Sequence, residues 1–193
     1  MFENVYRDLL NKYFKKNKSG KLKYLSLDSS FVKNQCASDV EYSGAWKKKR
    51  LSKISLIVDS NGVPISALLV KGNLSDQKIA YRNFKNTYID ITSTTNNNKH
   101  KRYMLADSGY DSNLMHDKID EFNITPIIWK MKRRKDFKKF NKRELAIYNR
   151  RSIVENTFSW IYQNRRTNLR HDKKSSNYMS FLFMAFIQII LKR

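Results

Sequence analysis

The chain has 193 residues, 40% of them hydrophobic, so it is long and apolar enough to form one folded domain and is not a disordered protein. Its 39 Lys and Arg residues outnumber 17 acids and give a formal net charge of +22, which favours nucleic acid as the partner, because binding to phosphates releases condensed counterions. The single cysteine excludes an intrachain disulfide framework and a cysteine-rich zinc site, so any metal site would be built from oxygen ligands.

Hydrophobic periodicity and turn residues predict alternating helices and strands. In chain order, we expect a helix over residues 2–16, a strand over 24–28, a β-hairpin with strands over 53–59 and 64–70, a helix from 76 to about 90, a strand over 103–107, a helix from 113 to about 122, a strand over 124–129, a helical region from 142 to about 166, and a last helix over 176–192. A hairpin followed by alternating elements predicts an α/β fold with a mixed central sheet.

The two ends of the chain carry no export or membrane signal. Residues 1–10 contain acids and no apolar stretch, so we expect no signal peptide and an intracellular protein that is not secreted. The apolar run at residues 181–191 is shorter than the roughly 18 residues of a membrane span, so we expect a buried closing helix and no membrane partner.

Two acids stand at the ends of predicted strands. Asp28 and Asp107 each follow an apolar strand directly and precede small turn-forming residues. Ligand sites of open α/β sheets gather at the carboxyl ends of strands, and two carboxylates placed there repel each other unless a cation bridges them. Mg²⁺ prefers such oxygen ligands. The alternative is that each Asp only caps the following turn.

Glu155 is the candidate third acid. It lies in a strongly basic stretch, and on a helix it shares a face with Tyr148, Ser152 and Tyr162. Arg151 is four residues before it, so an ordinary ion pair within the helix, worth about 0.2–0.5 kcal/mol, is the competing interpretation.

Four segments resemble motifs of the cut-and-paste insertion-sequence DDE transposases of groups four and five. They are Leu-Asp-Ser-Ser-Phe-Val-Lys at 27–33, the hairpin and Gly-Asn-Leu-Ser-Asp within 53–76, Leu-Ala-Asp-Ser-Gly-Tyr-Asp at 105–111, and Arg-Ser-Ile-Val-Glu-Asn-Thr-Phe-Ser-Trp at 151–160, followed by Arg165 and Arg166. Residues 184–191 are similar to the last helix of the family. Four motifs in the same order make the match specific.

This resemblance implies an RNase H-like (retroviral-integrase-like) fold, with a mixed five-stranded sheet flanked by helices. It implies that residues 24–193 are the DDE catalytic domain and that residues 1–23, a short helix and basic loop, are the remnant of an N-terminal region. A truncated chain or one frame of a split gene would have this form.

The resemblance also implies a function. Asp28, Asp107 and Glu155 would be the catalytic and metal-binding acids, with Mg²⁺ or Mn²⁺ as the cofactor and two ions about 3.5–4 Å apart. The activity would be DNA strand cleavage and strand transfer, with transposon ends and target DNA as partners. A homodimer is a further arrangement to consider.

DNA contacts are expected beside the third acid. Tyr148 and Arg151 match the family's spacing, but Tyr162 stands where many members have Lys, so Arg165 or Arg166 would have to replace that phosphate contact. We also expect a DNA-facing basic loop, and it contains Lys130, Lys132, Arg133 and Arg134.

Two other classes remain compatible with the residues. The charge alone would suit a non-catalytic basic nucleic-acid-binding protein, and the acids would suit another RNase H-like nuclease such as a resolvase. Metal binding at Asp28 distinguishes the first of these from a transposase.

Overall fold

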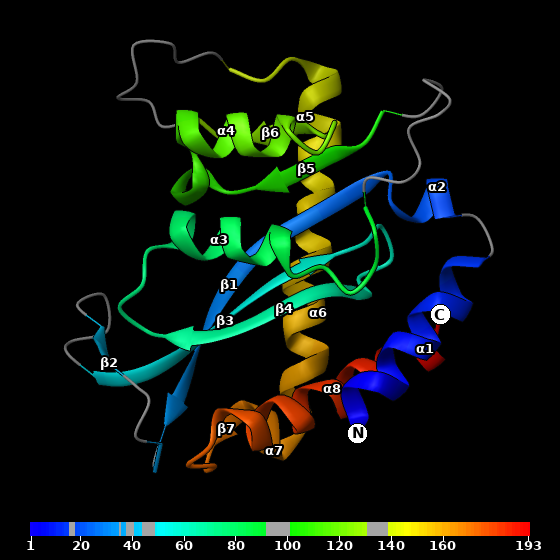
Figure 1. The fold of residues 1–193 in the computed structure, drawn as a ribbon. Helices are drawn as coiled ribbons and strands as arrows, with labels where there is room; N and C mark the ends of the chain where they lie inside the picture. Colours follow the sequence, from blue (N-terminus) through cyan, green and yellow to red (C-terminus); the bar gives the residue numbers. More distant parts are fainter. Residues whose placement is uncertain (16–17, 35, 38–40, 44–48, 92–100, 131–138) are drawn as a thin grey trace.

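A mixed β-sheet forms the centre of the protein in a computed structural model (Figure 1). The structure describes all residues except 16–17, 35, 38–40, 44–48, 92–100 and 131–138. The strands are β1 (Tyr24–Asn34), β2 (Glu41–Ser43), β3 (Lys49–Val58), β4 (Pro64–Lys71), β5 (Tyr103–Ala106), β6 (Thr125–Ile128) and β7 (Leu169–Arg170). Their order is β2-β3-β1-β5-β6, with β4 paired to β3 and β7 paired to β1.

Five of these strands form the sheet that the sequence predicts. β4, β3 and β1 are antiparallel neighbours, whereas β5 is parallel to β1 and β6 is parallel to β5. This arrangement confirms the mixed RNase H-like sheet. The described part of the chain contains seven strands rather than five, because β2 and β7 have only three and two residues and are too short to give a periodic signal.

Helices cover both faces of the sheet. They are α1 (Phe2–Lys15), α2 (Lys18–Lys21), α3 (Asp76–Lys85), α4 (Asn113–Asp120), α5 (Lys142–Tyr148), α6 (Ser152–Tyr162), α7 (Arg165–Asn168) and α8 (Ser175–Leu191), with short 3-10 helices η2 (Ser108–Tyr110) and η3 (Asn149–Arg151). In the view of Figure 1, α3 and α4 lie in front of the sheet, and α5 and α6 lie behind it. No helix among the described residues is long and apolar enough to cross a membrane.

Several expected element boundaries were wrong. The helix expected from 76 to about 90 ends at Lys85, and the first hairpin strand begins at Lys49 rather than at residue 53. β1 does not end at Asp28 but continues to Asn34, because residues 29–33 pair with β3, up to Lys33 opposite Leu51. The predicted helical region from 142 to about 166 is divided into α5, η3 and α6, and the chain leaves the helix at Gln163 before α7 begins.

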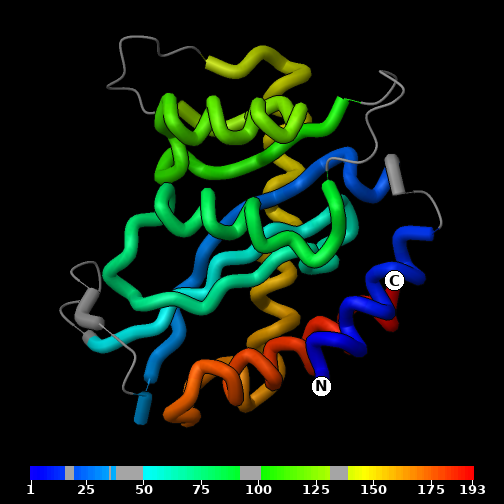
Figure 2. The backbone as a smooth tube through the Cα atoms, viewed as in Figure 1, coloured from blue at the N-terminus to red at the C-terminus, as the bar shows by residue number. Residues whose placement is uncertain are grey.

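The N-terminal helix is part of the main hydrophobic core. Tyr6 and Leu10 of α1 are fully buried, and the Tyr6 ring lies 5.5 Å from that of Phe186 in α8. The tube in Figure 2 shows α1 and α8 side by side, with both ends of the chain close to this helix pair. The division of the chain at residue 23 stays a prediction.

Candidate active site

The register of two parallel strands places the first two acids beside each other. Tyr24 pairs with Tyr103, and Ser26 pairs with Leu105. β5 ends at Ala106, so the same offset brings Asp107 next to Asp28. Because side chains alternate along a strand, both acids also project from the same face of the sheet.

Beyond this point β1 loses its parallel neighbour for several residues. β5 has ended, and β7 joins β1 only at Lys33. Among the described strands, Asp28 is therefore paired on one side only, with Leu56 of β3. Within the described sheet, the edge of β1 is therefore unpaired beside the two carboxylates.

Backbone amides hold both aspartates. The Ser29 amide donates a 2.8 Å hydrogen bond to Oδ1 of Asp28, and the Gly109 amide donates one of 2.8 Å to Oδ1 of Asp107. Asp107 is the N-cap of η2, so the turn after β5 depends on this carboxylate. The capping role that the sequence left open for Asp107 is therefore present, and it uses one oxygen of the carboxylate.

Arg151 connects the strand acids to the helix acid. Its Nη1 lies 3.6 Å from Oδ2 of Asp28, and its Nη2 donates a hydrogen bond to Oε1 of Glu155. The ion pair within the helix therefore exists, but Arg151 also reaches a carboxylate of the sheet. Glu155 lies in the first turn of α6 with its side chain 52% exposed, whereas the side chain of Asp28 is 22% exposed.

The electrostatics of Asp28 reflect its neighbours. The pKa of Asp28 is raised to about 6, chiefly by burial, and the negative charges of Asp107 and Glu155 contribute to this rise. The Ser29 hydrogen bond and the charge of Arg151 lower the same pKa. The three acids are thus close enough to influence one another, although they come from two strands and a helix.

The donor atoms suit a hard cation, since all three side chains offer carboxylate oxygens. In the part of the chain that the structure describes, no three such side chains are close enough together to hold an ion. Arg151 lies at two of the carboxylates, so shared coordination by Asp28 and Glu155 requires its guanidinium to move away.

Tyr148 and an aromatic cluster border the site. Burial raises the pKa of the Tyr148 hydroxyl, and Arg151 lies 5.9 Å from its ring. The Tyr148 ring also packs 5.5 Å from Trp129 and 5.2 Å from Phe140. The strand expected over 124–129 ends at Ile128, and Trp129, just after it, is 36% exposed.

The other predicted DNA contacts are not gathered at the carboxylates. Arg166 pairs with Asp172 at 3.0 Å, and Arg165 is exposed on α7, beyond the end of α6. Burial raises the pKa of Tyr162 to about 12, and its hydroxyl is buried near the charge of Asp28. Lys130 is half-buried next to β6. The expected contacts by Lys132, Arg133 and Arg134 lie outside the described residues.

The sequence interpretation missed a polar network behind Asp28. The Ser29 hydroxyl donates a 2.6 Å hydrogen bond to Oδ1 of Asp76, and the buried Lys53 donates one of 3.1 Å to the same oxygen. These contacts join the start of α3 to the middle of β1 and β3. The sequence placed Asp76 only at the start of an expected helix, because its partners on two distant strands left no local signal.

The known proteins to which this chain is similar are described as transposases. The family model described as the transposase DDE domain matches residues 19–190. A Burkholderia cepacia protein, named as a transposase for insertion sequence element IS402, is 27% identical over 136 residues, which cover 68% of this chain and 58% of that protein. The chain therefore spans less than two thirds of this curated relative.

Two solved structures are similar at lower identity. The crystal structure of the catalytic domain of Mos1 mariner transposase is 10% identical, with a TM-score of 0.43 over 99% of this chain and 87% of the other. The Mos1 mariner paired-end complex with Mn is 11% identical, with a TM-score of 0.46 over 99% of this chain and 59% of the other.

Proposed function

The chain belongs to the transposase DDE family, and from this premise we propose that it is the catalytic domain of a DNA transposase. The proposed reaction is metal-dependent DNA strand cleavage and strand transfer at the ends of an insertion sequence. Asp28, Asp107 and Glu155 are the proposed catalytic acids.

One observation carries this assignment of residues. The parallel register of β1 and β5 places Asp107 beside Asp28, and the charges of Asp107 and Glu155 both raise the pKa of Asp28, which supports a shared site for acids from β1, α6 and the end of β5. Burying carboxylates close to one another is unfavourable unless a cation compensates them. Ordinary capping explains one oxygen of Asp107, but it does not explain why the other two acids lie nearby.

Asp28, Asp107 and Glu155 would hold the divalent cation, with Mg²⁺ or Mn²⁺ as the proposed ion and two ions as the proposed number. When bound, such a cation would activate the attacking hydroxyl and stabilise the leaving oxygen of a phosphodiester. Phosphoryl transfer depends chiefly on positioning and charge neutralisation, so no nucleophilic side chain is required.

The chain's own residues would position the substrate. The amides of Ser29 and Gly109 fix one oxygen of each aspartate and leave the second oxygen of each for a ligand. The Arg151 guanidinium lies beside Asp28 and Glu155. Once its ion pair with Glu155 breaks, it would donate hydrogen bonds to a DNA phosphate. Tyr148 would support the guanidinium from one side.

The proposed partners are transposon ends and target DNA, and the proposed location is intracellular, at DNA. The net charge of +22 supports a polyanionic partner. A homodimer is proposed from the resemblance alone, and light scattering with and without DNA would test it.

The experiment compares three proteins on a duplex that carries the inverted repeats flanking the reading frame. We expect Mg²⁺- or Mn²⁺-dependent nicking at the repeat end by the natural protein and its loss in Asp107→Asn. Asp120→Asn is the matched control, because Asp120 is an exposed acid at the end of α4. Equal nicking by all three proteins would exclude the proposed site.

A non-catalytic basic protein that coats nucleic acid would give a different result. Such a protein would bind the duplex tightly with no metal-dependent nicking, and Asp28→Ala would not alter its binding of Mn²⁺. A loss of Mn²⁺ binding in Asp28→Ala, measured by titration calorimetry, would support the transposase.

A further inference from the structure

A groove of about 250 Å³ lies between α5 and the N-terminal ends of β1 and β5. Its lining residues are Lys23, Tyr24, Tyr103, Arg143, Ala146, Ile147 and Arg150, and we call it the β1–α5 groove. None of these residues belongs to the motifs that carry the family resemblance. Its lining contains none of the three acids and none of the predicted DNA contacts.

The lining is basic and aromatic. Three of the lining residues are Lys or Arg, and none of those that the structure describes is acidic. The Arg150 guanidinium lies 4.7 Å from the centre of the Tyr24 ring, and Lys23 Nζ lies 5.4 Å from it. The ring holds these cations at the groove, so the groove presents concentrated positive charge and attracts an anion.

The groove and the carboxylates lie on the same face of the sheet. Tyr24 is four residues before Asp28 on β1, and Tyr103 is four residues before Asp107. An even spacing keeps the side chains on one face, and four residues of strand span about 13 Å. This length corresponds to about four base-pair steps of duplex DNA at 3.4 Å each.

The residues of α5 and η3 that line the groove also lead to the carboxylates. Arg143, Ile147 and Arg150 are spaced by four and three residues, so they form one stripe along α5 and η3. Arg151 is the next residue after Arg150 and points to the carboxylates. Arg150 therefore lines the groove while Arg151 lies at the carboxylates, and a single DNA strand could contact both arginines.

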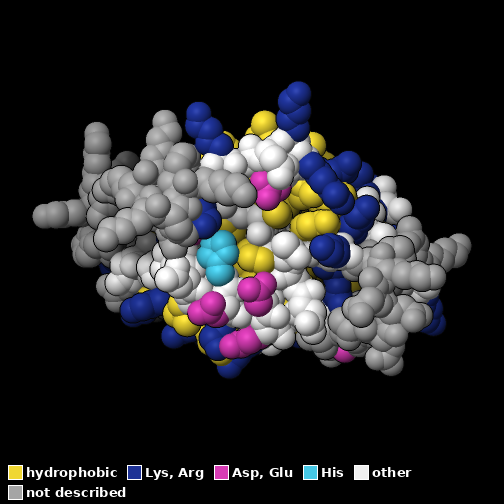
Figure 3. Space-filling model, turned by 90° about the horizontal axis from the view of Figure 1, so that it is seen from above, with side chains coloured by type: hydrophobic (Ala, Val, Ile, Leu, Met, Phe, Trp, Pro, Cys, Tyr) yellow, Lys and Arg dark blue, Asp and Glu magenta, His cyan; other side chains and the backbone are white. Residues whose placement is uncertain are grey.

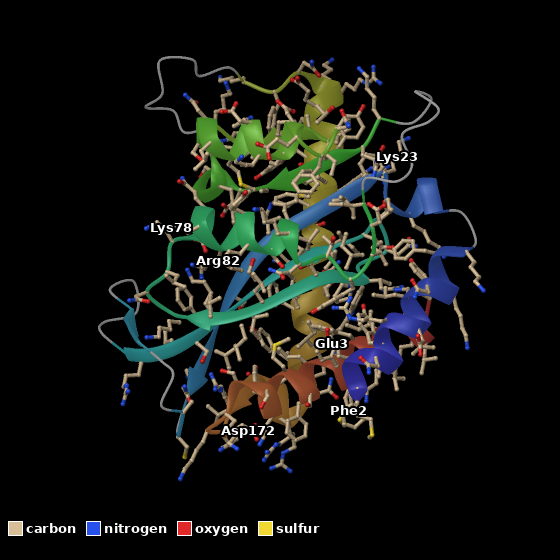
Figure 4. The ribbon with its side chains drawn as sticks, viewed as in Figure 1. Phe2, Glu3, Lys23, Lys78, Arg82 and Asp172 are labelled. Atoms are coloured by element: carbon tan, nitrogen blue, oxygen red, sulfur yellow. The ribbon has the colours of Figure 1, made fainter. Side chains whose placement is uncertain are left out.

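The distribution of charge over the surface agrees with this arrangement. Figure 3 looks onto the end of the molecule that carries α4, α5 and β5, and Lys and Arg side chains gather at the right of that view beside hydrophobic ones, while most acids lie in its lower half. Figure 4 labels Lys23 beside the start of β1, and it labels Lys78 and Arg82 on the other side of the molecule, at α3.

We propose that the β1–α5 groove binds the phosphate backbone of duplex DNA about four base pairs from the cleaved bond, through Lys23, Arg143 and Arg150. The Tyr24 ring has Arg150 over it and stacks with Tyr103 at 5.8 Å, so it is not free to stack on a base. The contact is therefore to phosphates and independent of sequence. It rests on the proposed function in taking DNA as the ligand and in placing the cleaved bond at the carboxylates.

The test compares two matched pairs of substitutions, each of which removes one Lys and one Arg from exposed positions. Lys23→Gln with Arg150→Gln alters the groove, and Lys78→Gln with Arg82→Gln alters α3. Dissociation constants for a duplex are measured by fluorescence anisotropy in chelator between about 50 and 200 mM salt, where each lost phosphate contact reduces the salt slope by about 0.9.

We expect the groove pair to reduce the slope by about two, so that affinity falls about tenfold less across this salt range, while the α3 pair leaves the slope unchanged. Arg150→Lys, which keeps the charge, should retain the slope. Equal slopes in the two pairs would overturn the proposal. A change in the oligomeric state of the groove pair, with an unchanged slope, would assign the groove to a second copy and would also overturn it.

Failure of this proposal can be told apart from failure of the catalytic one. Binding is measured without divalent metal, and Asp107→Asn should bind duplex with the natural slope. If the protein does not cleave DNA, the groove pair still shows its reduced slope. If the groove is not a DNA contact, the protein with the groove pair of substitutions still nicks DNA in a metal-dependent way, and its salt slope equals that of the natural protein.

Discussion

The Nη1 atom of Arg151 lies 3.6 Å from Oδ2 of Asp28, although Arg151 ends η3 and Asp28 lies in the middle of β1. The same guanidinium donates a hydrogen bond to Glu155, so one positive charge serves carboxylates of the sheet and of the helix. Without a metal, Arg151 partly neutralises acids that would otherwise repel one another.

Removing Arg151 should therefore favour metal binding. In Arg151→Gln, we expect the DNA-free protein to bind Mn²⁺ about two- to fivefold more tightly, because an ion pair worth up to about 1 kcal/mol no longer competes for the carboxylates. Titration calorimetry measures this affinity. Arg150→Gln is the control, since it removes the same charge one residue away, and equal effects of the two substitutions would contradict a direct competition.

Asp28 should lower the stability of the metal-free protein at neutral pH. Its folded pKa of about 6 exceeds the ordinary value of 3.8, so the folded state binds more protons between these two values, and stability falls as pH rises through this window. Asp28→Asn should raise the free energy of unfolding by on the order of 1–3 kcal/mol above about pH 7.

The measurement for Asp28→Asn is urea unfolding in chelator, at about pH 7.5 and about pH 4. The gain should be largely lost at the lower pH, where the carboxyl of the natural protein is almost fully protonated in the folded state and about half protonated in the unfolded state. Asp120→Asn, at an exposed position, should change stability little at either pH. A gain that is independent of pH would show that burial of the Asp28 charge is not the cause.

The hairpin tip should be intolerant of a side chain at Gly62. This residue has φ +81°, and an added Cβ would lie 2.8 Å from Oγ1 of Thr157 and 2.9 Å from Trp160 on α6. We expect Gly62→Ala to lower the free energy of unfolding by about 2–4 kcal/mol through backbone strain and displacement of α6.

Gly109→Ala is the control for Gly62→Ala in the same urea titration. Its Cβ would meet chiefly the carboxylate of Asp107 at 3.1 Å, so we expect a loss of less than about 1 kcal/mol. Equal losses of unfolding free energy in the two variants would mean that the contact between the hairpin tip and α6 does not stabilise the protein.

The N-terminal helix should contribute to the stability of the whole domain. Leu10 is fully buried in the core that α1 shares with α8, so Leu10→Ala should cost about 2–5 kcal/mol. Val5→Ala on the same helix, at a position that is 46% exposed, should have little effect. A small effect of Leu10→Ala on thermal unfolding would instead indicate that α1 is a dispensable appendage.

Local sequence was sufficient for the longer elements and, together with the family motifs, for the identities of the candidate acids. Apolar strands on either side of Asn61 predicted the β3–β4 hairpin. The helix expected from residue 113 begins there as α4, and the Ser112 hydroxyl caps it by accepting a hydrogen bond from the Met115 amide. These features depend on residues that are near one another in the chain, so periodicity and capping rules detect them.

The tertiary structure decided how these parts form a site. The parallel register of β1 and β5 brings Asp107 beside Asp28, the packing of η3 and α6 against β1 brings Arg151 to Asp28, and the pairing of residues 29–33 with β3 extends β1 past the acid. Each of these contacts joins residues that are far apart in the chain. Local propensity does not encode strand register or helix packing, because both result from burying apolar faces against distant partners.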